Sequence, residues 1–284
     1  MVPRHSRNWS TCSWARPRWT EMRRLLTAWA ASAVSLVAQA SPSATLELGS
    51  LVVTRTDGIR IEGARLVGST LTVRFDSGDL IPVRIDAAYR DPHDARGAML
   101  YELSLPAAQG ISDVCPVAPD GTKAALLLPG TWSADGRQIS ATGITVACTS
   151  GAMGKCVRWG YKPWLNEGHM MDHYLACTRA VTADYCGNGR THTRNGMAID
   201  IYDQIGVQQR ASESKSQAYT FESAWNAIGA VCVAHVRVPQ WTIDAAIEAC
   251  STRLPLISQG EACTEESARA AGALIYVRSP PPVQ

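Results

Sequence analysis

The placement of the cysteines is the feature that most constrains how this chain can fold. Cys12 precedes a short apolar segment near the N-terminus, and eight further cysteines follow that segment. If the segment directs export, the eight enter an oxidising compartment, where an even number of cysteines indicates a disulfide framework. We expect up to four disulfides, and their connectivity is open because eight cysteines allow roughly a hundred pairings. The cysteines concerned are Cys115, Cys148, Cys156, Cys177, Cys186, Cys232, Cys250 and Cys263.

The apolar segment has the layout of a signal peptide. Arg23 and Arg24 precede an apolar run over residues 25–37, and Ala38-Gln39-Ala40 has the small residues of a cleavage site. We expect cleavage after Ala40 and an exported mature protein, either periplasmic or extracellular. No cysteine directly follows the cleavage site, so a lipid anchor is not expected. No later segment is long and apolar enough to span a bilayer.

Residues 1–21 do not fit a signal peptide, since they carry four Arg and three Trp and no apolar periodicity. One explanation is a start codon assigned too early, with true initiation at Met22 and a signal peptide over residues 22–40. The alternative is an uncleaved membrane anchor, although the apolar run is shorter than the roughly 20 residues that a spanning helix needs.

Removal of residues 1–40 reverses the sign of the net charge. The whole chain has a formal charge of +2, but the leader contains six Arg and one Glu. The remainder has 21 basic and 24 acidic residues, a net charge of −3. A mildly acidic chain without basic runs offers no electrostatic footprint for nucleic acid. The partner that we expect is an unidentified extracytoplasmic ligand or protein.

Residues 41–143 are predicted to form a β-rich domain of six or seven short strands. Apolar and polar residues alternate over 71–75 and again over 81–85, which is the period of a half-buried strand. Asp57-Gly58 between two apolar runs is a hairpin signal. This spacing of short strands is typical of a small sandwich or barrel. Further strands are expected over 101–105, 125–128 and 144–148.

Helical periodicity enters after residue 150. The pattern predicts a short helix with Ser150 as N-cap and Gly160 as its end, a second over Met170–Ala180 and a third over Ile243–Arg253. Residues 230–238 alternate as a strand. The predicted fold class is therefore α+β: an N-terminal β-rich sandwich or barrel-like part, then a disulfide-rich α+β domain over 144–270. A C-terminal strand and Pro-rich tail occupy 271–284.

Three long motifs in this second part carry a resemblance to a known family. They are ACTSGAMGKCVRWGYKPW, ACTRAVTADYCGNGRTHTRNGMAIDIYD and FESAWNAIGAVCV, and the second contains Ala183-Asp184-Tyr185-Cys186. Over roughly residues 144–238 the chain resembles the ADYC domain family of exported bacterial proteins, which is named for that tetrapeptide. The resemblance implies export. It implies no reaction, because the biochemical role of the family is not established.

The stretch from Thr182 to Asp203 is rich in residues that occur in active sites. Asn195-Gly196 favours a two-residue hairpin turn, in which His192 and Asp200 lie on opposite faces of the ribbon. A catalytic dyad of these two is therefore not expected.

A structural role for the same stretch is the interpretation we favour. Asp184 would cap backbone amides, Gly187 and Gly189 would supply positive φ, and Cys186 would form a disulfide. Calcium is an alternative, since Asp184, Asn188 and Asp200 carry suitable oxygens, but their spacing does not match an EF-hand loop.

Three further features have catalytic or binding interpretations. His169 and His173 are four residues apart, as zinc ligands on a helix are, but Asp172 stands where the related peptidase motif has Glu. Cys232 as a nucleophile would break the even cysteine count. We therefore expect no metal and no cofactor. The aromatic residues of WGYKPW, namely Trp159, Tyr161 and Trp164, either bind a sugar or peptide when exposed or close the core when buried; we favour burial.

Two classes of function remain. The first, which we favour, is a disulfide-stabilised binding or structural module outside the cytoplasm. The second is an extracytoplasmic hydrolase with a site near His173, Asp184, His192 and Asp203, which would require these polar groups to converge in a cleft.

Overall fold

In this computed structural model, the described residues are 43–75, 78–94, 97–107, 110–133, 136–165, 169–212, 219–248, 250 and 257–280. The predicted leader, residues 1–40, and the final residues of the Pro-rich tail lie outside them. Ala40–Gln284 form one compact unit. Of the described helices, none has the length and apolar character needed to cross a membrane.

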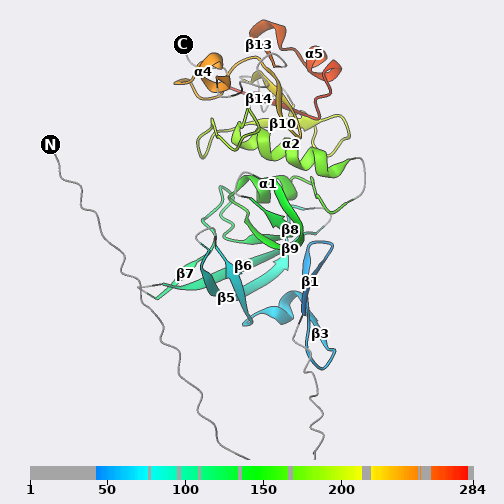
Figure 1. The fold of residues 1–284 in the computed structure, drawn as a ribbon, viewed down its shortest axis with the longest axis vertical. Coiled ribbons are helices and arrows are strands. Elements are labelled where there is room, and N and C mark those ends of the chain that lie inside the picture. Colours follow the sequence, from blue (N-terminus) through cyan, green and yellow to red (C-terminus); the bar gives the residue numbers. More distant parts are fainter. Residues whose placement is uncertain are drawn as a thin grey trace, which may run out of the picture. The chain divides into compact units, whose positions relative to one another are not determined.

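The strands predicted in the N-terminal part are present and form two antiparallel sheets (Figure 1). The larger has the order β4-β5-β6-β8-β9, with β7 beside β6. The smaller has the order β1-β2-β3, and Asp57-Gly58 lies in the turn of its second hairpin, as predicted. The sandwich or barrel-like arrangement stays a prediction. The strands are β1 (Ser43–Glu47), β2 (Ser50–Thr54), β3 (Arg60–Glu62), β4 (Thr70–Arg74), β5 (Leu80–Arg90), β6 (Met99–Ala107), β7 (Gly110–Asp113), β8 (Ala125–Trp132) and β9 (Gln138–Cys148).

The C-terminal part contains a five-stranded sheet of order β10-β14-β11-β12-β13. All pairings are antiparallel except that of β12 with β13. The strand predicted over 230–238 ends at Val233, earlier than its alternation indicates. Its strands are β10 (Asp200–Asp203), β11 (Thr220–Asn226), β12 (Gly229–Val233), β13 (Ser258–Gln259) and β14 (Ile275–Ser279).

The helices agree with the predicted positions but differ at their ends. The first predicted helix is capped by the backbone of Gly151 and not by a Ser150 side chain. The helix predicted over Ile243–Arg253 ends at Ile247, and residues 249 and 251–256 lie outside the described part. The elements are η1 (Gly63–Leu66), α1 (Ala152–Arg158), α2 (Met170–Thr182), α4 (Ile243–Ile247), η3 (Gly260–Ala262) and α5 (Glu265–Ala270).

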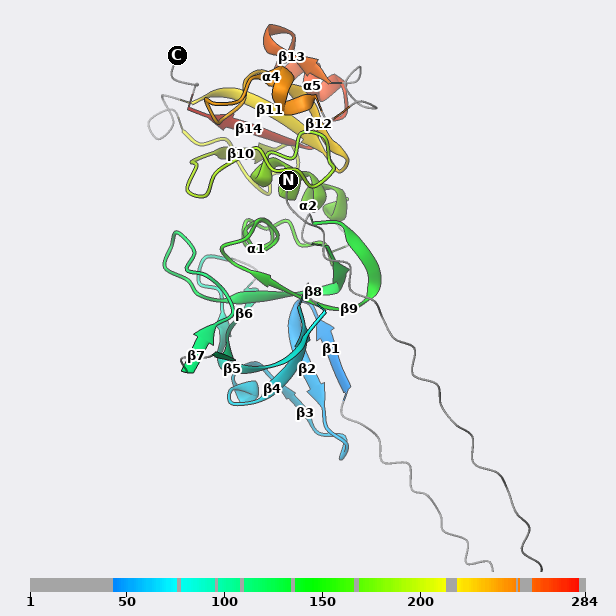
Figure 2. The same ribbon diagram turned by 60° about the vertical axis from the view of Figure 1, so that its left-hand side comes forward.

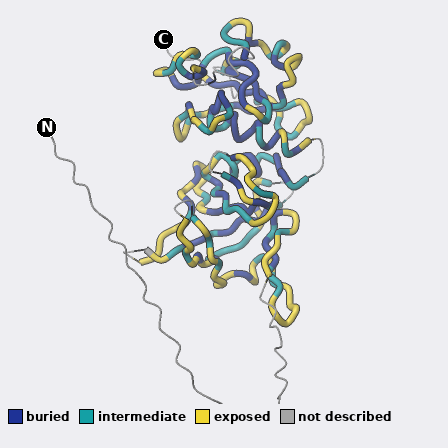
Figure 3. The backbone as a smooth tube through the Cα atoms, viewed as in Figure 1, coloured by how far each residue is buried: buried dark blue, intermediate teal, exposed yellow. Residues whose placement is uncertain are grey.

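Helices α1 and α2 lie between the six-stranded and the five-stranded sheet (Figure 2). Buried residues of β8, both helices, β11 and β14 form one continuous apolar cluster, in which Trp132 and Tyr174 meet edge to face at 5.2 Å. A second cluster fills the opposite face of the six-stranded sheet, and a third lies between the five-stranded sheet and α5. In Figure 3, α2 and the five-stranded sheet are mostly buried, whereas the turn between β2 and β3 is exposed.

Four disulfides use all eight cysteines that follow the leader. One joins α1 to α2, one joins the segment after β7 to the end of β9, and the other two lie in the C-terminal part. Because each bond closes a loop of the unfolded chain, the four together limit the conformations that compete with the fold. The pairs are Cys115–Cys148, Cys156–Cys177, Cys186–Cys250 and Cys232–Cys263.

Candidate functional site

Asp184 closes the C-terminal end of α2. The helix ends at Thr182, and Ala183 takes a left-handed conformation with φ of 50°. The buried Asp184 carboxylate then accepts hydrogen bonds from the amides of Asn188 and Gly189, at 3.1 and 2.9 Å. It also accepts one from Arg179 Nη1 at 2.7 Å. The side chain therefore caps a turn, as the structural interpretation predicted.

The turn itself is packed tightly against the hairpin of β11 and β12. Gly187 has a φ of 68°, and a Cβ at this position would lie 1.7 Å from the carbonyl oxygen of Ile228. The amide of Ala230 donates to the carbonyl of Tyr185 at 3.0 Å, and the disulfide between Cys186 and Cys250 also holds the turn. We call residues 183–189 the ADYC turn.

His192 lies beneath the ADYC turn and is 1% exposed. Its Nδ1–H donates to the carbonyl of Ala183 at 3.0 Å, and its ring contacts those of Tyr185 and Trp241 with centroids 5.4 and 5.1 Å away. Burial lowers the pKa of His192, so the imidazole is neutral at pH 7. The surrounding rings make it a packed core residue.

The hairpin predicted over residues 191–200 is wrong. A turn exists at Asn195-Gly196, where the amide of Met197 donates to the carbonyl of Arg194. No strand ladder follows it, because the backbone amide of His192 bonds instead to Thr182 and Asp200 pairs with Arg278 of β14. Asp200, which the predicted hairpin placed in its own second strand, therefore pairs with β14 instead.

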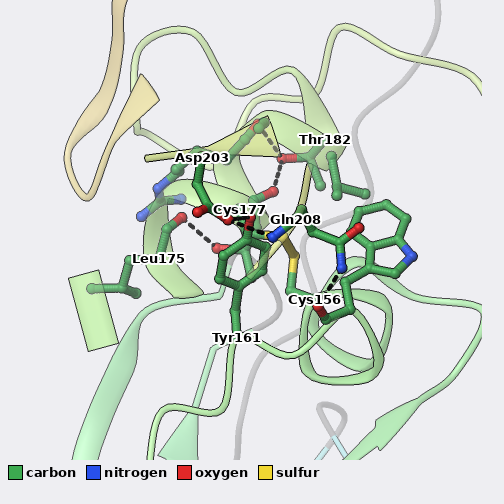
Figure 4. The surroundings of a disulfide bond; sticks show 12 residues. Cys156, Tyr161, Leu175, Cys177, Thr182, Asp203 and Gln208 are labelled. Atoms are coloured by element: carbon green, nitrogen blue, oxygen red, sulfur yellow. Dashed lines mark hydrogen bonds between the residues drawn. A yellow bond between two sulfur atoms is a disulfide. The ribbon is translucent and has the colours of Figure 1, made fainter. Parts of the chain in front are cut away.

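His173 and Asp203 lie on either side of Tyr161. The His173 ring stacks on the Tyr161 ring with centroids 6.4 Å apart, and the Tyr161 hydroxyl donates to Asp203 Oδ2 at 2.6 Å. Asp203 also accepts four backbone amides of the turn after β10, from residues 205–208. Gln208 Nε2 donates to the carbonyl of Trp159 at 2.6 Å, next to the Cys156–Cys177 disulfide (Figure 4). Burial and then the adjacent Asp203 carboxylate raise the pKa of Tyr161, so the phenol stays protonated and acts as a donor.

Replacing Tyr161 by phenylalanine is expected to cost about 2 kcal/mol of stability, because it removes a buried hydrogen bond to a charged acceptor. Urea denaturation of both proteins measures the difference. Tyr174→Phe is the matched control, since the buried Tyr174 hydroxyl has no hydrogen-bond partner among the described residues. Equal losses in the two variants would refute a contribution from the bond to Asp203.

The four candidate catalytic residues do not form one cluster. From His173 to Thr182, α2 rises about 13.5 Å at roughly 1.5 Å per residue. His173 and Asp203 therefore lie toward one end of the helix, and Asp184 and His192 lie at the other. Proton transfer needs heavy atoms about 3 Å apart, so a single acid–base site built from all four is not supported by this geometry.

The histidine pair of α2 is not arranged as a ligand pair. His169 precedes the helix in a left-handed conformation and is exposed, whereas His173 is buried and its Nδ1 contacts the carbonyl of His169 at 3.2 Å. Across the described residues, no three His, Cys, Asp or Glu side chains gather in a way that would hold a metal ion.

The three aromatic residues of WGYKPW have different surroundings. Tyr161 is fully buried, and the ring of Trp164 packs so closely on Gly49 that a Cβ there would lie 2.8 Å from it. The neighbouring Lys162 forms a buried ion pair with Asp94 at 2.6 Å. Trp159 is partly exposed and lines a surface cavity of about 220 Å³.

One face of α1 builds this cavity. Lys155, Arg158 and Trp159 follow the i, i+3, i+4 spacing that places side chains on the same side of a helix. His93, after β5, and Asp120, before β8, complete the lining. We call this space the α1 cavity. Of its five residues, only Trp159 had been singled out from the sequence. The helical spacing could have indicated Lys155 and Arg158, but no sequence pattern marked His93 or Asp120.

The two cationic side chains on the α1 face of the cavity differ in their ion pairs: Arg158 has two carboxylate partners, and Lys155 has none among the described residues. Arg158 donates to Asp91 through Nε at 2.6 Å and contacts Asp120 through Nη1 at 2.7 Å. Although desolvation opposes ionisation of Asp120, hydrogen bonds from Arg158 and Thr122 outweigh it and lower the pKa of Asp120 to about 2. Lys155 forms no ion pair with any described residue, and burial lowers its pKa. Its ammonium is the one lining cation that the described part of the fold leaves without a carboxylate.

Comparison with known proteins gives one match. A family model described as the ADYC domain matches residues 63–239, which is more than half of the chain. The matched range includes the α1 cavity and the ADYC turn, and it begins within the β-rich part, upstream of the resemblance seen in the sequence motifs. No curated protein and no solved structure matches the chain.

Proposed function

The chain belongs to the ADYC domain family, and on this premise we propose that it is an exported binding module whose ligand occupies the α1 cavity. Export is supported by the signal-peptide layout of the leader and by the pairing of all eight later cysteines, which is a property of proteins from oxidising compartments.

Some polar side chains already use their hydrogen-bonding capacity inside the fold, whereas others do not. This difference supports a binding role over a catalytic one. Asp184 and Asp203 accept several internal hydrogen bonds each, and His192 is packed between aromatic rings. Such groups hold the fold together and have little capacity left for a substrate. Lys155 and Trp159 differ, since they line a cavity and the Lys155 ammonium has no ion-pair partner in the described chain. This unpaired cation beside an aromatic ring is the observation that carries the proposal.

A ligand screen by saturation-transfer NMR tests the proposal. The screen uses the mature protein with its disulfides intact and a set of small carboxylates, sugars, amino acids and nucleotides. We expect at least one class to bind with a dissociation constant near or below about 1 mM, which corresponds to roughly 4 kcal/mol. The hits should weaken at least tenfold in Lys155→Gln.

Lys123→Gln is the control variant. Lys123 is about half exposed, is paired with Asp113 and is not one of the residues that line the α1 cavity. Its loss should leave every hit unchanged. Hits that persist equally in both variants would locate binding elsewhere, and a complete absence of hits would favour a purely structural module.

A further inference from the structure

The α1 cavity has the size for one small ring. Its volume of about 220 Å³ far exceeds the roughly 10–15 Å³ that one water molecule needs. It lies below the roughly 300–1,000 Å³ of sites that take drug-sized molecules. A ligand that fills it is therefore comparable to a monosaccharide or a single aromatic ring with substituents.

The placement of charge in the cavity, with the Lys155 ammonium outside any ion pair of the described residues, favours a ligand with one negative charge. Arg158 is held by Asp91 and Asp120 together, which leaves one carboxylate in excess around the guanidinium. Lys155 forms an ion pair with neither carboxylate, so its ammonium remains available to a ligand. A monoanion that pairs with Lys155 gains a charge-assisted hydrogen bond. A phosphate monoester would bring a second negative charge toward Asp120, and like charges a few ångströms apart repel.

The remaining lining suits hydroxyl groups and a flat apolar face. The Asp120 side chain is 35% exposed, and although its oxygens accept from Arg158 and Thr122, a carboxylate has about four acceptor sites. Free capacity there matches donors on a ligand, and the exposed His93 ring adds another polar contact. The partly exposed Trp159 ring offers a surface on which the C–H face of a sugar ring can pack.

From these three features we infer that the α1 cavity binds an acidic sugar, with its carboxylate on Lys155, its hydroxyls toward Asp120 and its ring against Trp159. This inference rests on the proposed binding function and specifies the ligand class. It assigns to Arg158 a positioning role, because its ion pair with Asp120 fixes the acceptor that the hydroxyls meet.

Isothermal titration of the mature protein with D-glucuronate at pH 7 is the test. Glucuronate should bind, and D-glucose, which lacks the carboxylate, should bind at least tenfold more weakly. Glucose 6-phosphate should bind at least tenfold more weakly than glucuronate as well. Lys155→Gln should lose at least tenfold in glucuronate affinity, whereas Lys155→Arg, which keeps the charge, should stay within about threefold.

The outcomes distinguish failure of the acidic-sugar assignment from failure of the proposed binding function. Equal binding of glucose and glucuronate, or tighter binding of the phosphate ester, overturns the acidic-sugar assignment. If no sugar binds but another small molecule does and loses affinity in Lys155→Gln, the assignment fails while the binding function stands. If nothing binds the cavity, both fail. Circular dichroism of each variant verifies that the fold is retained.

Discussion

Gly187→Ala is expected to destabilise the folded protein by about 4 kcal/mol or more, the largest effect of any single substitution considered. The added Cβ would lie 1.7 Å from the carbonyl oxygen of Ile228, and φ at this residue is 68°. The turn cannot easily move away from the Ile228 backbone, because the ADYC turn is held by the amide of Ala230 and by the Cys186 disulfide. The measurement is the midpoint of urea unfolding under non-reducing conditions.

Gly196→Ala separates the steric part of this effect from the conformational part. Gly196 has a φ of 85°, also in the left-handed region, but a Cβ there meets no atom within 4 Å. Only the backbone strain remains, which costs about 1–2 kcal/mol. If the two variants unfold at the same denaturant concentration, close packing of the ADYC turn on the β11–β12 hairpin is not a source of stability.

Arg237→Met is expected to cost about 3–5 kcal/mol, because it leaves a buried carboxylate without its partner. Arg237 donates to Glu222 through Nε and Nη2, at 3.0 and 2.8 Å, and Glu222 is fully buried. The same guanidinium donates to the carbonyls of Ala180 and Val181 in the last turn of α2. The side chain thus joins the end of the helix to β11. Thermal unfolding followed by circular dichroism provides the measurement.

Two controls show whether burial of the charge causes this loss. The double variant Glu222→Leu/Arg237→Met removes both charges and should recover about 2 kcal/mol relative to Arg237→Met alone. Arg60→Met breaks an ion pair with Glu47 of similar length, 2.7 Å, but both side chains are about half exposed. Its cost should be much smaller than that of Arg237→Met, because exposed ion pairs are screened by solvent. A double variant less stable than Arg237→Met would contradict the explanation.

The local patterns predicted much of the fold because they reflect local physics. Period-two alternation located β4 and β5, and Asp57-Gly58 located a hairpin, since both depend on neighbouring residues. The prediction failed where a distant strand decided the outcome. Asn195-Gly196 forms its turn, but β14 supplies the partner of Asp200 from almost 80 positions further along the chain.

The candidate site was predictable only in part for the same reason. The capping role of Asp184 follows from its place between a helix end and two glycines, and the structure confirms the hydrogen bonds. The α1 cavity requires Asp120 and His93 to meet α1, and no local pattern encodes that meeting. Arg158 also has both of its carboxylate partners in the preceding β-rich part, so its pairing depends on tertiary contacts.

The position of β14 determines when the five-stranded sheet can fold during synthesis of the chain. This strand, Ile275–Ser279, pairs with both β10 and β11 and so lies inside the five-stranded sheet, although it is the last element synthesised among those described. Until it emerges, β10 and β11 each present an unpaired edge, which is a template for aggregation. The sheet therefore cannot be completed until β14 has been synthesised and is free to pair with both strands. Folding of this sheet must wait for β14, its most C-terminal strand, and the aggregation-prone interval ends only when β14 pairs.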